Sequence, residues 1–62
     1  MNLEKLNEIM NEKSISAPKL AKLTGIQLTM VYRVIRGTTK NPSIMTVKKI
    51  ADALEVKIDD IV

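Results

Sequence analysis

Apolar residues recur every three or four positions in several stretches of this chain, the spacing expected for one buried face of a helix. The first stretch follows Asn2, a residue type that caps helix starts, and we expect its helix to end near Glu12 or Lys13. Met10 within it, and Met30 further on, are interpreted as core side chains that fill gaps. The apolar positions of this first stretch are Leu3, Leu6, Ile9 and Met10.

The segment Ser16–Gly37 holds two short helical patterns joined at one glycine. Ser16 is a good N-cap, and Pro18 falls in the first turn, where its missing N–H costs little. Gly25 ends the first pattern in the left-handed region, and the second pattern runs from about residue 27 to 36. A helix this short is not stable alone, so its neighbour must hold it. The expected apolar sides are Leu20, Ala21 and Leu23 in the first helix and Met30, Val31, Val34 and Ile35 in the second.

A polar loop follows Gly37 and leads to another helical pattern. Ser43 is expected to cap a helix from Ile44 to about Leu54. The expected core face of this helix is Ile44, Val47, Ile50, Ala51 and Leu54. Residues 59–62 are expected to form one turn of a fifth helix. The pattern therefore predicts an all-α protein, a compact bundle of five short helices, with residues 1–62 forming a single domain.

Composition removes several kinds of chemistry. The 62 residues include no cysteine and no histidine, which excludes disulfides, thiol chemistry, zinc fingers and imidazole catalysis. A chain of this length buries only about 60% of its unfolded surface, so the core must be small. No signal peptide and no apolar run of about 18 residues is visible, so we expect a soluble, cytoplasmic protein.

Charge is divided unevenly along the chain, and the net charge of +3 understates this. The acidic residues lie in the first twelve residues and after residue 50. The middle has no acidic residue and eight basic ones: Lys13, Lys19, Lys22, Arg33, Arg36, Lys40, Lys48 and Lys49. If these residues gather on one side of the molecule, the positive electrostatic potential there favours binding of a polyanion. The alternative is a solvated helical surface whose charges are placed by chance, and Lys48 and Lys49 fit that alternative better than contact with a polyanion.

Five groups of residues occur at a spacing typical of one family. They are Leu20–Ile26 (LAKLTGI), the set Val31, Val34 and Gly37, then Asn41–Ser43, Ile50–Ala51, and Ala53–Val56. Together they resemble the Cro/cI-type (XRE-like) helix-turn-helix family of phage and bacterial repressors. The resemblance extends from Ile15 to Ile61 without an insertion. It implies a lambda-repressor-like DNA-binding domain whose helix-turn-helix spans about residues 16–37, with the second helix of the motif in the major groove.

The resemblance also implies which residues touch DNA. Matched by position, the base contacts are Gln27, Leu28, Thr29, Tyr32 and Arg33. The fork of Arg33 fits the O6 and N7 acceptors of guanine, whereas Leu28 replaces a polar residue and would pack on a thymine methyl group. Tyr32 has an alternative role, packing against the loop after Gly37. The implied phosphate contacts are Ser16, Ala17, Arg36, Thr38, Thr39, Lys40 and Asn41.

One departure from the family lies at the start of the motif. Ala17 and Lys19 stand where many relatives carry a glutamine and a glutamate. The capping box is therefore lost, and a phosphate contact here must come from backbone N–H groups.

These features predict a small transcriptional regulator that binds a short operator and represses by occlusion. A protein-interaction module, antitoxin-like or an adaptor, is the alternative, and sequence-selective DNA binding by the isolated chain distinguishes the two. We expect no cofactor, no metal and no enzymatic activity, because no nucleophile–base pair and no phosphate-cradling glycine loop are visible.

We expect a homodimer on a pseudo-palindromic site, because one small domain makes few base contacts, each worth about 1–3 kcal/mol. The expected contact surface is the C-terminal segment, with Ile58, Ile61 and Val62. The alternative is that Ile58 and Ile61 point inward and only Val62 is exposed.

Overall fold

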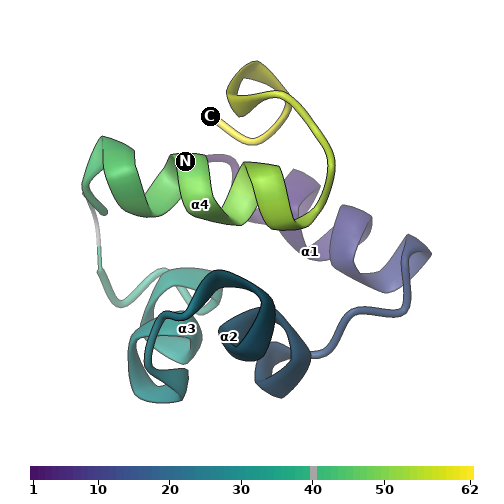
Figure 1. Ribbon diagram of the computed structural model, residues 1–62. Helices are drawn as coiled ribbons and strands as arrows, with labels where there is room; N and C mark the ends of the chain where they lie inside the picture. Colours follow the sequence, from purple (N-terminus) through teal and green to yellow (C-terminus); the bar gives the residue numbers. More distant parts are fainter. Residues whose placement is uncertain (40) are drawn as a thin grey trace.

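The computed structural model describes residues 1–39 and 41–62, and in these residues it contains helices and no strand. The elements are α1 (Leu3–Glu12), α2 (Ala17–Thr24), α3 (Leu28–Ile35), α4 (Ile44–Ala53) and the 3-10 helix η1 (Ile58–Asp60) (Figure 1). The all-α fold is confirmed. The prediction of a fifth α-helix was wrong. The last element is a 3-10 helix of three residues, which is too short for a full α-helical turn of intrahelical hydrogen bonds.

The helices surround one small core. In Figure 1, α4 lies across α2 and α3, and η1 lies on the side of α4 away from them. α2 packs against both α3 and α4, while α1 packs against α3. Every α-helix contributes buried side chains, which is how helices of eight to ten residues become stable. The core consists of Leu6, Ile9, Met10, Ala17, Leu20, Val31, Val34, Val47, Ile50, Ala51, Leu54 and Ile61.

Short polar side chains begin three of the helices, as the sequence predicted. The Asn2, Ser16 and Ser43 side chains accept hydrogen bonds from backbone N–H groups three residues later. The remaining α-helix, α3, has Gln27 at its N-cap position, and the Gln27 side chain makes no capping hydrogen bond. The start of α3 is therefore the one α-helical N-terminus in the described residues without a side-chain cap, and its N–H groups are open to a ligand.

Three residues expected in the core are exposed instead: Leu23, Met30 and Ile44. Leu23 lies on the edge of α2, which is covered on one side by α3 and α4. Met30 occupies the edge of α3, whose buried residues are Val31 and Val34. Ile44 is the first residue of α4, and its side chain is 65% exposed. In each case helical spacing identified an apolar side, but the neighbouring helices cover only part of it.

The two ends of the described chain are joined by a hydrogen bond. The Asn2 N–H donates to the Ile61 carbonyl over 2.8 Å, and the Ile61 side chain is fully buried. Ile58 is half-buried, whereas Val62 is 57% exposed. The expectation that Ile61 lies in a dimer contact was therefore wrong, because that side chain completes the core of its own chain.

Candidate nucleic-acid interface

The turn between α2 and α3 fixes how the two helices meet. Gly25 ends α2 with φ of 74°, a left-handed conformation that costs glycine little. The Thr24 hydroxyl donates to the Leu20 carbonyl at 2.8 Å and accepts the Ile26 N–H at 3.2 Å. The half-buried Ile26 then packs against the core. These contacts make the turn a rigid link, so the direction of α3 is set by α2.

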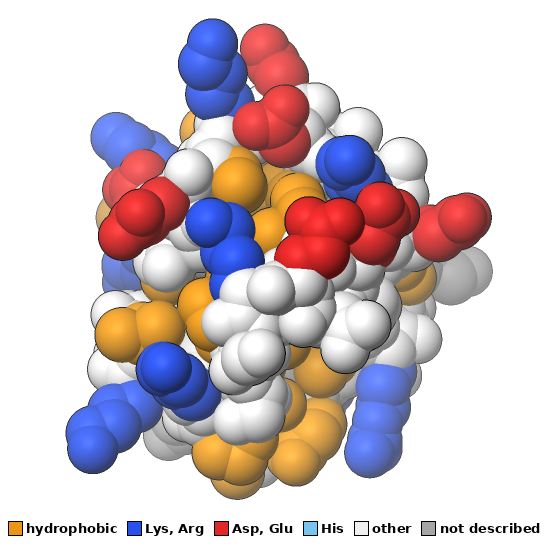
Figure 2. Space-filling model, turned by 90° about the vertical axis from the view of Figure 1, so that its right-hand side faces the viewer, with side chains coloured by type: hydrophobic (Ala, Val, Ile, Leu, Met, Phe, Trp, Pro, Cys, Tyr) orange, Lys and Arg blue, Asp and Glu red, His pale blue; other side chains and the backbone are white. Residues whose placement is uncertain are grey.

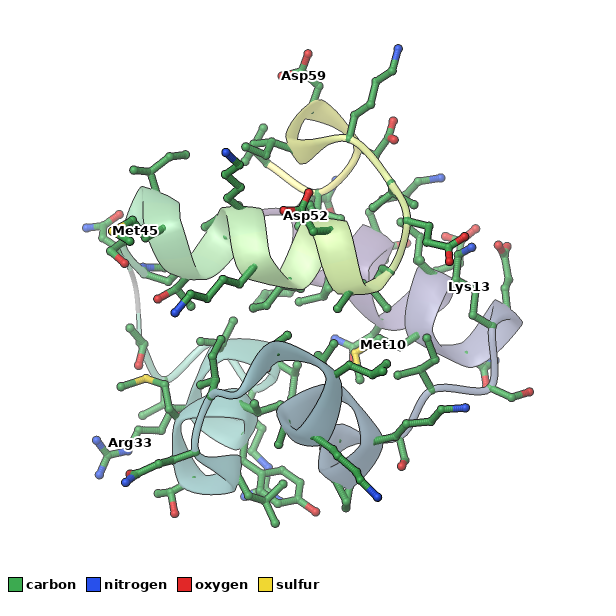
Figure 3. All side chains as sticks on the ribbon, in the orientation of Figure 1. Met10, Lys13, Arg33, Met45, Asp52 and Asp59 are labelled. Atoms are coloured by element: carbon green, nitrogen blue, oxygen red, sulfur yellow. The ribbon has the colours of Figure 1, made fainter. Side chains whose placement is uncertain are left out.

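The outward side of α3 carries a line of polar side chains. Thr29, Arg33 and Arg36 are all exposed and are spaced by four and then three residues, so they share one side. Figure 3 shows Arg33 extending from α3 away from the body of the molecule. Val31 and Val34 hold the opposite side of the helix in the core. The helix is thus anchored by two valines and presents two guanidinium groups to solvent.

The start of α3 lies at one end of this line. Gln27 and Leu28 are both exposed, and the Gln27 side chain makes no capping bond that would hold it back. The uncapped N–H groups and the helix dipole give this end a partial positive charge. It therefore favours an anionic or hydrogen-bond-accepting partner.

Tyr32 is placed differently from the other predicted base contacts, because its ring is half-buried. The Arg36 guanidinium carbon lies 4.8 Å from the centre of the ring. This is the distance of a cation–π contact. Packing of Tyr32 within its own chain is thus observed, while contact of the ring with a base stays a prediction.

The loop after α3 is held by its backbone. The Thr38 and Thr39 N–H groups both donate to the Arg33 carbonyl, at 2.9 and 3.2 Å. Their hydroxyl groups, rather than their N–H groups, are thus the donors that a phosphate would meet. Thr38 and Asn41 are exposed and Thr39 is half-buried. Lys40, the remaining predicted phosphate contact of this loop, lies outside the described residues.

The start of α2 is a weaker part of the predicted site. The Ser16 hydroxyl oxygen already accepts the Lys19 N–H at 3.4 Å, and the Ala17 side chain is buried. Pro18 has no N–H to offer. The backbone N–H of Ala17, at the first position of the helix, is consequently the group here best placed for an anion.

The charge of the surface agrees with the division seen in the sequence. On the face shown in Figure 2, acidic side chains occur in the upper part, and the lower part shows Lys and Arg without Asp or Glu. In the upright orientation shared with Figure 1, that lower part corresponds to α2 and α3. The helix-turn-helix thus lies on the cationic side of the molecule.

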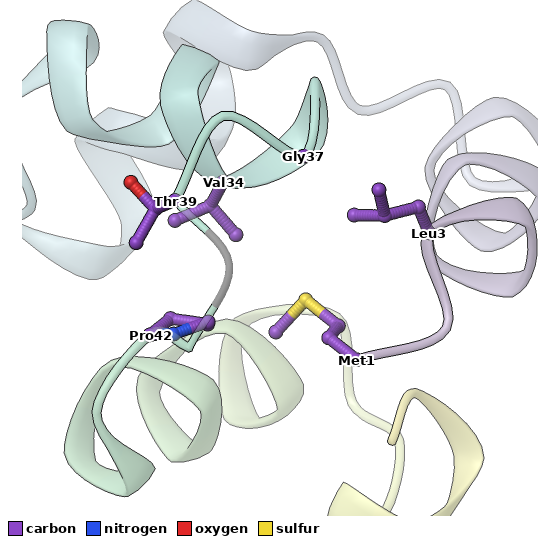
Figure 4. Close-up of a pocket in the computed structure, with 6 residues that line it drawn as sticks. All are labelled: Met1, Leu3, Val34, Gly37, Thr39 and Pro42. Atoms are coloured by element: carbon purple, nitrogen blue, oxygen red, sulfur yellow. The ribbon is translucent and has the colours of Figure 1, made fainter.

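Two apolar hollows beside α4 could not be predicted from the sequence. One, of about 220 Å³, lies between the start of α1 and the α3–α4 connection and is lined by Met1, Leu3, Val34, Gly37, Thr39 and Pro42 (Figure 4). The other, of about 200 Å³, is lined by Met1, Asn41, Pro42, Ile44, Val47 and Val62. Met45, next to Ile44, is 69% exposed. The large apolar residue Ile44 at the start of α4 was a sequence signal for the second hollow.

Two short helices joined by a rigid turn, with the second presenting arginines on a cationic side, define a helix-turn-helix DNA-binding domain. Comparison with known families agrees: residues 5–62 match the model of the Cro/C1-type HTH DNA-binding domain. The chain belongs to this family. Members of this family bind DNA, and they are typically transcription regulators rather than enzymes. No curated protein and no solved structure matches the chain significantly.

Two further properties bear on the kind of partner. None of the helices in the described part of the chain is long and apolar enough to span a membrane. Residues 1–39 and 41–62 also contain no group of three or more acidic, histidine or cysteine side chains placed to hold a metal ion.

Proposed function

We propose that this protein binds a specific double-stranded DNA sequence in the cytoplasm and represses transcription by occluding it. The observation that supports this most directly is the exposed line of Thr29, Arg33 and Arg36 on a helix held rigidly by α2. A helix presented in this way fits the major groove, where base edges differ in their donors and acceptors.

In this proposal the start of α3 and Arg33 in its last turn read bases, and the residues that follow the helix contact the DNA backbone. Gln27, Leu28, Thr29 and Arg33 face base edges, and Arg33 forms two hydrogen bonds to a guanine. The phosphate contacts come from Arg36, the polar loop 38–41 and the start of α2. All of these side chains except Thr39 and Ala17 are exposed where the structure describes them, as such contacts require.

Selection of binding sites from random duplex DNA tests the proposal. We expect one recurrent half-site with at least one guanine whose preference depends on Arg33. A variant with the same charge, Arg33→Lys, serves as the control for non-specific attraction. If the parent binds all duplexes equally, sequence-specific repression is wrong, and the antitoxin-like or adaptor alternative becomes the better account.

We further propose that the working species is a homodimer on a pseudo-palindromic operator. Val62, an exposed apolar residue of the C-terminal segment, lines the 200 Å³ hollow together with Ile44. The apolar patch consists of Met1, Pro42, Ile44 and Val62, which all line this hollow. It combines protruding side chains with a hollow on one surface, which suits the self-complementary contact of a twofold dimer.

The size of the domain is compatible with this arrangement. The backbone measures 23 × 22 × 18 Å, and side chains add about 3 Å on each side. Two copies in contact would have centres up to about 29 Å apart, which is comparable to the roughly 34 Å between half-sites one DNA turn apart. The size of the domain is therefore compatible with a dimer that spans two adjacent half-sites.

A further inference from the structure

The pair formed by Tyr32 and Arg36 is the one cation–π contact found in the described residues. The two residues are four apart, on neighbouring turns of the same helix edge, and the Arg36 N–H donates to the Tyr32 carbonyl at 3.0 Å. Tyr32 is half-buried, while Arg36 is exposed. The exposed arginine side chain therefore rests on the ring of a more buried residue.

This contact leaves the hydrogen-bonding groups of the guanidinium available. The N–H donors of arginine point outward in the plane of the group, whereas an aromatic ring covers its face. Stacking therefore restricts the orientation of the Arg36 side chain and leaves its N–H donors unoccupied.

The surroundings of Arg36 indicate an anion as its partner. Arg36 is the C-cap of α3, and the exposed Thr38 and Asn41 lie in the loop that follows. A cation is favoured at this negative end of the helix dipole, so Arg36 is stabilised at the C-terminal end of α3. A guanidinium group, followed along the chain by exposed hydroxyl and amide donors, suits phosphate oxygens.

We propose that Tyr32 is a positioning residue, which holds the Arg36 guanidinium on its ring so that Arg36 meets a DNA phosphate. This assigns to Tyr32 a role other than base contact, and it rests on the proposed DNA binding. The energy of binding comes from Arg36, and the ring reduces the freedom that Arg36 loses when it binds.

The contact can first be detected without DNA. Tyr32 is the only aromatic residue of the chain, since Phe, Trp and His are absent. Any strong ring-current shift in the proton NMR spectrum must therefore come from this ring. We expect the side-chain protons of Arg36 to be shifted upfield in the parent and in Tyr32→Phe, and to return to ordinary positions in Tyr32→Leu.

The effect on DNA binding is measured by a double-mutant cycle on a fixed duplex. We expect Tyr32→Leu to weaken binding about two- to fivefold on cognate and random duplexes alike, and Tyr32→Phe to keep the parent's affinity. In an Arg36→Ala background, Tyr32→Leu should have no further effect. Arg36→Lys leaves the ring in place and so does not threaten folding. It should lose a similar factor, because an ammonium group stacks less well on a ring.

The outcomes separate the two proposals. Equal affinity of the parent, Tyr32→Leu and Arg36→Lys would overturn the positioning role while leaving DNA binding intact. A loss in Tyr32→Leu that persists in the Arg36→Ala background, or that is confined to one base pair, would also overturn it, because the ring would then act by itself. A parent that binds no duplex would overturn the proposed function, and the positioning role with it, even if the ring-current shift is present.

Discussion

The side chain of Leu3 at the start of α1 lies directly over the α-carbon of Gly37 at the end of the helix-turn-helix. A β-carbon placed on Gly37 would meet Leu3 Cδ1 at 2.6 Å, and Gly37 has φ of 78°. Asn7 of α1 adds a hydrogen bond from its side-chain N–H to the Ile35 carbonyl at 3.3 Å. α1 is therefore fitted closely to the point where α3 passes into the loop.

We expect Gly37→Ala to destabilise the protein more than Gly25→Ala. Both glycines have a positive φ, which costs an alanine about 1–2 kcal/mol, but the space beside Gly25 is open. The additional cost at Gly37 comes from displacing Leu3. Urea unfolding followed by circular dichroism measures both variants. Equal losses would show that Leu3 moves aside freely.

Arg33→Ala is expected to cost about 1–3 kcal/mol on the best site and to relax preference at one base pair. Arg33→Lys should restore non-specific affinity before it restores selectivity, because the ammonium group lacks the two-pronged geometry. Binding to duplexes that differ at single positions measures both effects. Unchanged base preferences in Arg33→Ala would mean that another side chain reads the site.

Arg36→Ala is expected to weaken binding to all sequences alike and to lower the slope of log affinity against log salt by about one unit. Lys57→Ala is the matched control, since Lys57 is the N-cap of η1, and η1 lies on the side of α4 away from α2 and α3. Titrations at several salt concentrations give both slopes. A change confined to one base position, or an equal change in Lys57→Ala, contradicts a phosphate contact by Arg36.

Ile44→Ser and Val62→Ser are expected to reduce cooperative binding to a full site at least tenfold while half-site binding is unchanged. Burial of a large aliphatic side chain is worth about 1.5–3 kcal/mol, and a twofold contact contains each residue twice. Leu23→Ser is the control, because Leu23 is 53% exposed on α2, outside the apolar patch. Sedimentation with and without DNA measures the dimer, and a monomer on the full site would rule it out.

Ile61→Lys, by contrast, is expected to unfold the protein rather than to separate a dimer. The side chain is fully buried, and an unpaired charge there would be strongly unfavourable. Thermal unfolding of the variant measures this. A folded variant would show that the C-terminal turn can detach from the core without loss of the fold.

Local features were predictable because their causes lie within a few residues. A serine accepts an N–H three positions later, and Ser16 and Ser43 cap helices for this reason alone. Gly25 and Gly37 were predictable as helix ends because the left-handed conformation favours glycine over other residues. The cationic middle of the chain, likewise, was visible without coordinates.

The sequence by itself thus determined the helices, their caps, the helix-turn-helix and the sign of its surface. Only the tertiary structure decided which apolar residues are covered, since helical period defines a side of a helix but neighbouring helices determine how much of it is buried. Ile44 and Leu23 are exposed because neighbouring helices do not cover them, whereas Ile61 is buried. The contact of Tyr32 with Arg36 was also undecided, because spacing allows two side chains to meet, and only the surrounding packing holds the ring where they do.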